Sequence, residues 1–157
     1  MMILRSEAKR PLARCESGSA LAEIAVVLPM LVLLLLALIE VGRYGYYTIL
    51  VSNAARAGVQ YGAQNTVTAA DSAGITTSAK SDGQNITGLS ATPTIFCKCS
   101  DGGPSTCAAT DCPSNHRIIY VQVVTSALVP MVTNSALLPA PLRNVTVSGK
   151  AVMRVAQ

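Results

Sequence analysis

The chain has 157 residues, of which 50% are hydrophobic and only 13% are charged, against roughly 25% charged residues in an average soluble domain. This composition excludes a disordered polypeptide, and the net charge of +4 is not gathered into a basic stripe with interleaved aromatic residues, so we expect no nucleic-acid partner. With one histidine and eight scattered acidic residues, the sequence offers no catalytic constellation, so we predict a protein that is not an enzyme and holds no cofactor or metal.

The first predicted element is an uninterrupted apolar run from Ile24 to Ile39, with a glutamate on each side. The run forms a helix of roughly 24 Å, and the wider segment Ser19–Gly42 reaches roughly 36 Å, which is enough to cross a bilayer of about 30 Å. A domain of this size cannot wrap a helix that is apolar on every side, which disfavours a buried core helix. We therefore predict a transmembrane segment over residues 19–42.

The charges that flank the run predict its orientation. Before it stand Arg5, Lys9, Arg10 and Arg14, and only Arg43 follows it closely. Because positively charged flanks stay in the cytoplasm, we expect a cytoplasmic N-terminus and an exported region at residues 43–157. A cleaved secretory signal would need a small-x-small site directly after the run, and the sequence Glu40-Val41-Gly42-Arg43-Tyr44 does not offer one.

Glu23 is unusual because a carboxylate in an apolar helix costs about 2.5–3.5 kcal/mol at the bilayer centre. Gly18 ends the basic leader, and Glu23 is the fifth residue after it. This arrangement resembles the class III signal of type IV pilins and pseudopilins. The resemblance implies that residues 1–18 are a prepilin leader, that a prepilin peptidase cuts between Gly18 and Ser19, and that Glu23 pairs with the new N-terminal amine of a neighbouring subunit. The alternative is an uncleaved signal anchor with an incidental glutamate.

Further motifs narrow the resemblance. In order they are Gly18, Leu21-Ala22-Glu23-Ile24-Ala25, Leu28-Pro29, Ile39-Glu40-Val41-Gly42-Arg43 and Ala54-Ala55-Arg56-Ala57-Gly58. This pattern is similar to that of the TadE-like pseudopilins, minor pilins of the tight-adherence (type IVc, Flp) pilus. It implies a role in pilus assembly and surface attachment, with the prepilin peptidase, other pilins and pseudopilins, the inner-membrane assembly platform and the lipid bilayer as partners.

The same resemblance implies a single-pass protein of the bacterial inner membrane, with its C-terminal domain in the periplasm or incorporated into the pilus. Two alternatives remain. A pseudopilin of a type II secretion apparatus is disfavoured because position 19 is Ser rather than Phe. An uncleaved, membrane-anchored binding module is the alternative from another class.

Beyond the membrane the helix should continue to about Gln64, because apolar or small residues recur at helical spacing along one face. These are Tyr47, Val51, Ala54, Gly58 and Tyr61. Pro29 removes one backbone hydrogen bond within the helix and predicts a kink. A second, short helix is predicted from Ala69 to Ala79, with Thr68 as its N-cap.

From Thr92 onward the period changes to two, which predicts strands. The first carries Ile95, Cys97 and Cys99 on one face, the second runs from Arg117 to Thr125, and the third runs from Val145 to Val155 with a possible bulge at Gly149. A loop containing Pro130, Pro139 and Pro141 joins the last two. We predict a pilin-like α+β fold in which a long N-terminal transmembrane helix packs on a small antiparallel sheet.

Four of the five cysteines lie close together, at positions 97, 99, 107 and 112. In an exported domain an even number of cysteines predicts two disulfides, for which three pairings exist. The nested pairing, Cys97–Cys112 with Cys99–Cys107, is favoured because the strand turns back through a Gly-Gly-Pro loop. A zinc site is the alternative, although its usual paired C-x2-C spacing is absent.

Overall fold

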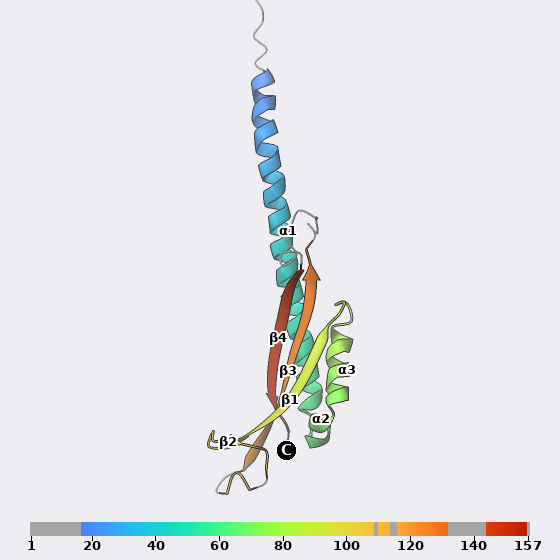
Figure 1. Ribbon diagram of the computed structural model, residues 1–157, viewed down its shortest axis with the longest axis vertical. Helices are drawn as coiled ribbons and strands as arrows, with labels where there is room; N and C mark the ends of the chain where they lie inside the picture. The colour runs from blue at the N-terminus through green and yellow to red at the C-terminus, as the bar shows by residue number, and fades with distance from the viewer. Residues whose placement is uncertain (1–16, 109, 114–115, 132–143, 157) are drawn as a thin grey trace, which may run out of the picture. The chain divides into compact units, whose positions relative to one another are not determined.

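The computed structural model describes residues 17–108, 110–113, 116–131 and 144–156, in two compact units divided between Leu38 and Ile39. The fold is α+β, as the sequence predicts, with a long N-terminal apolar helix and a small four-strand antiparallel sheet (Figure 1). The predicted leader, 1–18, lies outside the described residues except for its last two positions.

Helix α1 spans Ser17–Gly62, within two residues of its predicted ends at both termini. Its apolar part is exposed on every side: Leu21 and Met30, for example, are 69% and 70% exposed. An 18-residue window of this helix has a mean hydropathy of 2.9 and none of it is buried. Pro29 lies inside the helix without ending it. By length and composition this helix is able to cross a membrane.

The second half of α1 packs in the larger unit through the predicted stripe. Val51, Ala54 and Gly58 are buried, and the two tyrosines at the ends of the stripe, Tyr47 and Tyr61, are half-buried. Ala55 and Val59 are buried as well, so the packed face is wider than the predicted stripe. Small side chains along this face let the helix lie close to the sheet.

The predicted helix from Ala69 to Ala79 is two helices, α2 (Thr66–Ala70) and α3 (Ser72–Asp82). The N-cap of the first is Asn65 rather than Thr68, because Asn65 Oδ1 accepts hydrogen bonds from the backbone N–H groups of Val67 and Thr68, both at 2.9 Å. Asp71 ends α2 and caps α3 by accepting a 2.9 Å hydrogen bond from Gly74 N. The side chain of Asp71 therefore separates the two helices.

The sheet contains strands β1 (Ser90–Cys99), β2 (Pro104–Ser105), β3 (Arg117–Pro130) and β4 (Asn144–Arg154) in the order β2-β1-β3-β4, with every pairing antiparallel. The three predicted strands are present, and the two-residue β2 is an addition. Strand β3 continues past the predicted end at Thr125 to Pro130. The other two prolines of the predicted loop, Pro139 and Pro141, lie outside the described residues.

One face of the sheet forms the core with the helices, as alternate residues of β3 show. Val121, Val123, Thr125, Ala127 and Val129 are buried, and the residues between them are half-buried or exposed. Two clusters form along this face. Val51, Ala54 and Val147 belong to one, and Val59, Ile75 and Val121 belong to the other. Among the described residues, no helix lies on the opposite face of the sheet (Figure 1).

Gly149 marks a close approach of the sheet to α1, not the bulge that the sequence suggested. The pairing of β3 with β4 runs without interruption from Tyr120–Arg154 to Pro130–Asn144. A Cβ atom on Gly149 would stand 2.7 Å from Ser52 Cα and 2.8 Å from Ser52 N, both backbone atoms of α1. Only a residue without a side chain fits here, because backbone atoms cannot yield.

Candidate functional site

The predicted processing residues lie in the first turns of α1. Gly18 is exposed, and no atom lies within 4 Å of the position that a Cβ on it would take. Glu23 is exposed on the same helix, five residues further along. Five residues correspond to about 7.5 Å along the axis and about 140° around it, so Gly18 and Glu23 occupy different faces. The Gly18–Ser19 peptide bond and the Glu23 carboxylate are thus separate features of one exposed helix.

Arg43, four residues after the apolar run, joins α1 to the sheet. Its guanidinium Nη1 lies 3.3 Å from Glu40 Oε2, one helical turn earlier, and Nη2 donates to the carbonyl oxygen of Pro130 at 3.3 Å. Pro130 is the last residue of β3. The basic residue that follows the apolar run therefore joins α1 to one end of the sheet, a contact that no local sequence pattern predicts.

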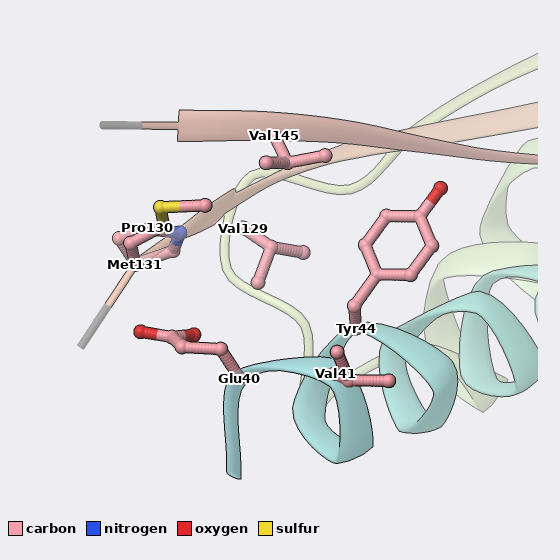
Figure 2. Close-up of a pocket in the computed structure, with 7 residues that line it drawn as sticks. All are labelled: Glu40, Val41, Tyr44, Val129, Pro130, Met131 and Val145. Atoms are coloured by element: carbon pink, nitrogen blue, oxygen red, sulfur yellow. The ribbon is translucent and has the colours of Figure 1, made fainter. Parts of the chain in front are cut away.

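An apolar cavity of about 240 Å³ lies beside this contact (Figure 2). Its lining residues come from α1, from β3 and the residue after it, and from β4: Glu40, Val41, Tyr44, Val129, Pro130, Met131 and Val145. The carboxylate of Glu40 is the only charged group among them. The described lining contains no nucleophile with an adjacent base, which catalysis by acyl or phosphoryl transfer would require.

A buried hydrogen bond joins α1 to β3 at the middle of the domain. Thr125 is fully buried, and its Oγ1 donates to the carbonyl oxygen of Val51 at 2.7 Å. The carbonyl oxygen of Gly149 lies 3.4 Å from the same hydroxyl. The local pattern of alternation predicts only a strand at Thr125, because its hydrogen-bond partner is 74 residues away.

A second polar contact holds the end of α1 against α3. The Tyr61 hydroxyl donates a hydrogen bond to Asp71 Oδ2 at 2.9 Å, while the other carboxylate oxygen caps α3. The hydrogen bonds from Gly74 N and from Tyr61 lower the pKa of Asp71. The hydrogen bond to Asp71 raises the pKa of Tyr61, because the carboxylate favours the protonated phenol.

The two disulfides join Cys97 to Cys107 and Cys99 to Cys112, so the nested pairing is wrong. The short strand β2 explains the difference. It pairs Cys97 with Ser105, which brings Cys107, two residues later, to the neighbourhood of Cys97 rather than Cys99. Cys107 then has φ 74° and turns the chain back, so that Cys112 reaches Cys99. All four sulfurs are bonded in pairs, which leaves no thiolate for the zinc alternative.

The carboxylate of Asp111 stabilises the loop between these disulfides by accepting hydrogen bonds. Its Oδ2 accepts hydrogen bonds from the hydroxyls of Ser105 and Thr106 and from the backbone N–H groups of Thr106 and Ala108. The hydrogen bond from the Thr106 side chain is the largest cause that lowers the pKa of Asp111. Arg117 adds a hydrogen bond from Nη1 to the carbonyl oxygen of Cys107. No local sequence pattern predicts this role of Asp111, because its hydrogen-bond partners depend on the turn at Cys107.

Comparison with known families decides the nature of the helix. The family model of TadE-like proteins matches residues 18–60. Over these residues the N-terminal helix of this chain is similar to that of TadE-like proteins. This match confirms the resemblance seen in the sequence, and it covers nearly the whole of α1 from Gly18 onward. No curated protein and no solved structure matches the chain.

The matched segment contains the predicted processing residues and the arginine that contacts the sheet. It includes Gly18 and Glu23 as well as Arg43, while the sheet and the disulfide loop follow after it. TadE-like proteins are structural proteins related to the Tad pilus and are not enzymes. In this chain, the apolar helix is consistent with a single-pass membrane anchor.

Proposed function

We propose that this chain is a minor pseudopilin of the tight-adherence pilus, cut by a prepilin peptidase between Gly18 and Ser19 and acting in pilus assembly and surface attachment. The observation that carries the proposal is an exposed apolar helix whose only acidic residue before Glu40 stands five residues after a glycine, within the TadE-like segment. Its partners are the peptidase, the other pilins and pseudopilins, the assembly platform and the lipid bilayer.

In this proposal the protein begins in the bacterial inner membrane with residues 1–18 in the cytoplasm and residues 43–157 in the periplasm. Cleavage removes the basic leader and leaves the apolar helix free to enter a filament. The two disulfides in the larger unit agree with this location, because such bonds persist in the oxidising periplasm.

Processing is tested by replacing the residue before the cut. The full chain is expressed with and without a prepilin peptidase, and its intact mass is measured. The wild type should lose the 18 residues that precede Ser19, whereas Gly18→Leu should stay uncut because a bulky side chain keeps the backbone away from the peptidase. Gly42→Leu is the matched control, since this exposed glycine of α1 also has no atom within 4 Å of its Cβ position.

Gly42→Leu should be cut as efficiently as the wild type. A wild-type chain that keeps its leader in the presence of an active peptidase would contradict the proposal and favour an uncleaved membrane-anchored module. Equal cutting of Gly18→Leu would show that the cut lies elsewhere.

The role of Glu23 in assembly is tested separately. Glu23→Gln keeps the shape of the side chain and removes its charge, so membrane insertion should be unchanged or improved. Assembly should fail, because the N-terminal amine of a neighbouring subunit would lose its partner among apolar helices, a loss of about 3–5 kcal/mol for a buried pair.

The measurement is recovery of the protein in sheared pili, with the amount in the membrane as reference. Glu40→Gln is the matched control, because Glu40 is paired with Arg43 on its own helix and has no predicted partner in another subunit. Equal recovery of wild type and Glu23→Gln would show that the glutamate is incidental.

A further inference from the structure

The sheet face that carries no helix holds an uncompensated set of positive charges. The outward positions of β1, β3 and β4 include three basic residues, Lys98, Lys150 and Arg154, and no acidic residue. All three side chains are exposed, and none makes a hydrogen bond or ion pair within the described part of the chain. A face with charges of one sign and no partners attracts ligands of the opposite charge.

An aromatic pair lies among these charges. Phe96 of β1 and Tyr120 of β3 face each other in register, with ring centroids 5.2 Å apart and planes 10° from parallel. Arg154 of β4 pairs with Tyr120 in the same row, and Lys98 is the next outward residue of β1 after Phe96. The pair is half-buried and lies between two cations, Lys98 and Arg154.

The rest of the face is rich in small hydroxyl groups. Its further polar outward residues on β1, β3 and β4 include Thr92, Thr94, Gln122, Ser126, Thr146 and Ser148. Its apolar outward residues include Ile118, Val124, Val152 and Leu128, which is 62% exposed. Lys150 and Arg154 are four residues apart on one strand, or about 13 Å. An extended ligand with repeated anionic groups and many hydroxyls fits such a surface better than a compact one.

We propose that this face binds an anionic polysaccharide, with carboxylate or sulfate groups on Lys98, Lys150 and Arg154 and a sugar ring against Phe96 and Tyr120. Basic side chains form charge-assisted hydrogen bonds with such anions, and an aromatic surface accepts the C–H groups of a sugar ring. This face lies outside the TadE-like segment, so the proposed binding of a polysaccharide does not depend on whether the chain is cut at Gly18.

Position disfavours a membrane lipid as the ligand. Arg43, four residues after the apolar run, contacts Pro130 at one end of β3. Along that strand Val124, the partner of Lys150, lies six residues from Pro130 and Tyr120 lies ten. These separations are about 20 Å and about 33 Å. Three cations divided between β1 and β4 do not form the continuous basic stripe that follows a nucleic-acid backbone, which disfavours a nucleic acid.

The test uses the full chain in micelles of an uncharged detergent. Binding to immobilised polygalacturonate, a carboxylated polysaccharide, is measured over a range of salt concentrations. Neutral dextran, a single-stranded oligonucleotide and vesicles containing an anionic phospholipid are the comparison ligands. We expect binding to polygalacturonate that weakens as salt rises, no binding to dextran, and weaker binding to the oligonucleotide and the vesicles.

Two double variants remove the same charge from opposite sides of the domain. Lys150→Gln/Arg154→Gln should weaken binding to polygalacturonate about tenfold or more, because two charge-assisted contacts are lost. Arg56→Gln/Lys80→Gln, at exposed positions of α1 and α3, should bind within about twofold of the wild type. Tyr120→Leu keeps apolar volume and removes the ring, so the binding that persists at high salt should fall. Circular dichroism and thermal melting confirm that each variant is folded.

No binding by the wild type, or an equal loss in both double variants, would overturn the site. Equal or tighter binding to the oligonucleotide, or to the vesicles, that depends on Lys150 and Arg154 would overturn the choice of ligand class.

Discussion

Replacing Gly149 by alanine tests the packing of the sheet on α1. The new Cβ would lie 2.7 Å from Ser52 Cα, 2.8 Å from Ser52 N and 2.9 Å from the carbonyl carbon of Val51. None of these backbone atoms can turn away as a flexible side chain would, so β4 or α1 must move. The movement also strains the buried hydrogen bond from Thr125 to Val51, which lies beside Gly149.

The expected loss of stability has two parts. Overpacking of a tight interior costs about 1–3 kcal/mol, and weakening one buried hydrogen bond costs about 1 kcal/mol more. We therefore expect Gly149→Ala to lower the free energy of unfolding by about 2–4 kcal/mol. For a domain of this size each kcal/mol lowers Tm by about 3–5 °C, so the shift should be about 6–20 °C.

The assay is thermal unfolding of the full chain in detergent, followed by near-ultraviolet circular dichroism of its tyrosines. Gly45→Ala is the matched control, because its Cβ would meet no atom within 4 Å and alanine favours the helix over glycine by about 1 kcal/mol. Its Tm should be unchanged or higher. A Tm of Gly149→Ala equal to that of the wild type would refute the close approach of β4 to α1.

Two further predictions concern the disulfide loop. Digestion of the oxidised protein with trypsin and an aspartate-directed protease separates all four cysteines, and mass spectrometry should find Cys97 bonded to Cys107 and Cys99 to Cys112; a peptide that joins Cys97 to Cys112 would contradict this pairing. Because the folded state lowers the pKa of Asp111, its carboxylate stabilises the loop above the ordinary pKa of an aspartate, and this contribution disappears as the pH falls through the lowered value. The Tm difference between wild type and Asp111→Asn should therefore be largest near neutral pH and vanish in acid; a pH-independent difference would show that the charge of Asp111 is irrelevant.

Local sequence patterns predicted the elements whose stability depends on their own residues. The apolar run and the stripe around Val51 gave α1 to within two residues, and alternation gave β1, β3 and β4. These patterns record which faces are buried, and burial dominates the free energy of folding.

Features that depend on distant partners were missed or misassigned. Asp71 separates α2 from α3 and bonds to Tyr61, ten residues earlier. Gly149 was expected at a bulge, although the reason for a glycine there is the backbone of Ser52. The disulfide pairing depends on the two-residue strand β2, which is too short to give an alternating pattern. In each case the cause is a tertiary contact that a local pattern does not contain.

The residues of the two proposals differ in the same way: some are predicted from local sequence, and others are brought together only by the fold. The proposed processing residues, Gly18 and Glu23, are predicted from their spacing together with the basic leader before them and the apolar helix after them, all of which are local to one segment of the chain. The uncompensated face with Lys150 and Arg154 became visible only when the register of β3 and β4 put them on one side of the sheet with Phe96 and Tyr120.

The most direct test of the central claim is the N-terminal sequence of the wild-type protein recovered from the membranes of cells that express it together with an active prepilin peptidase. If the chain is a processed pseudopilin, the mature protein begins Ser19-Ala20-Leu21-Ala22-Glu23, with Glu23 at its fifth position. A protein that retains Gly18 and the basic residues before it, in cells with an active prepilin peptidase, would contradict the claim.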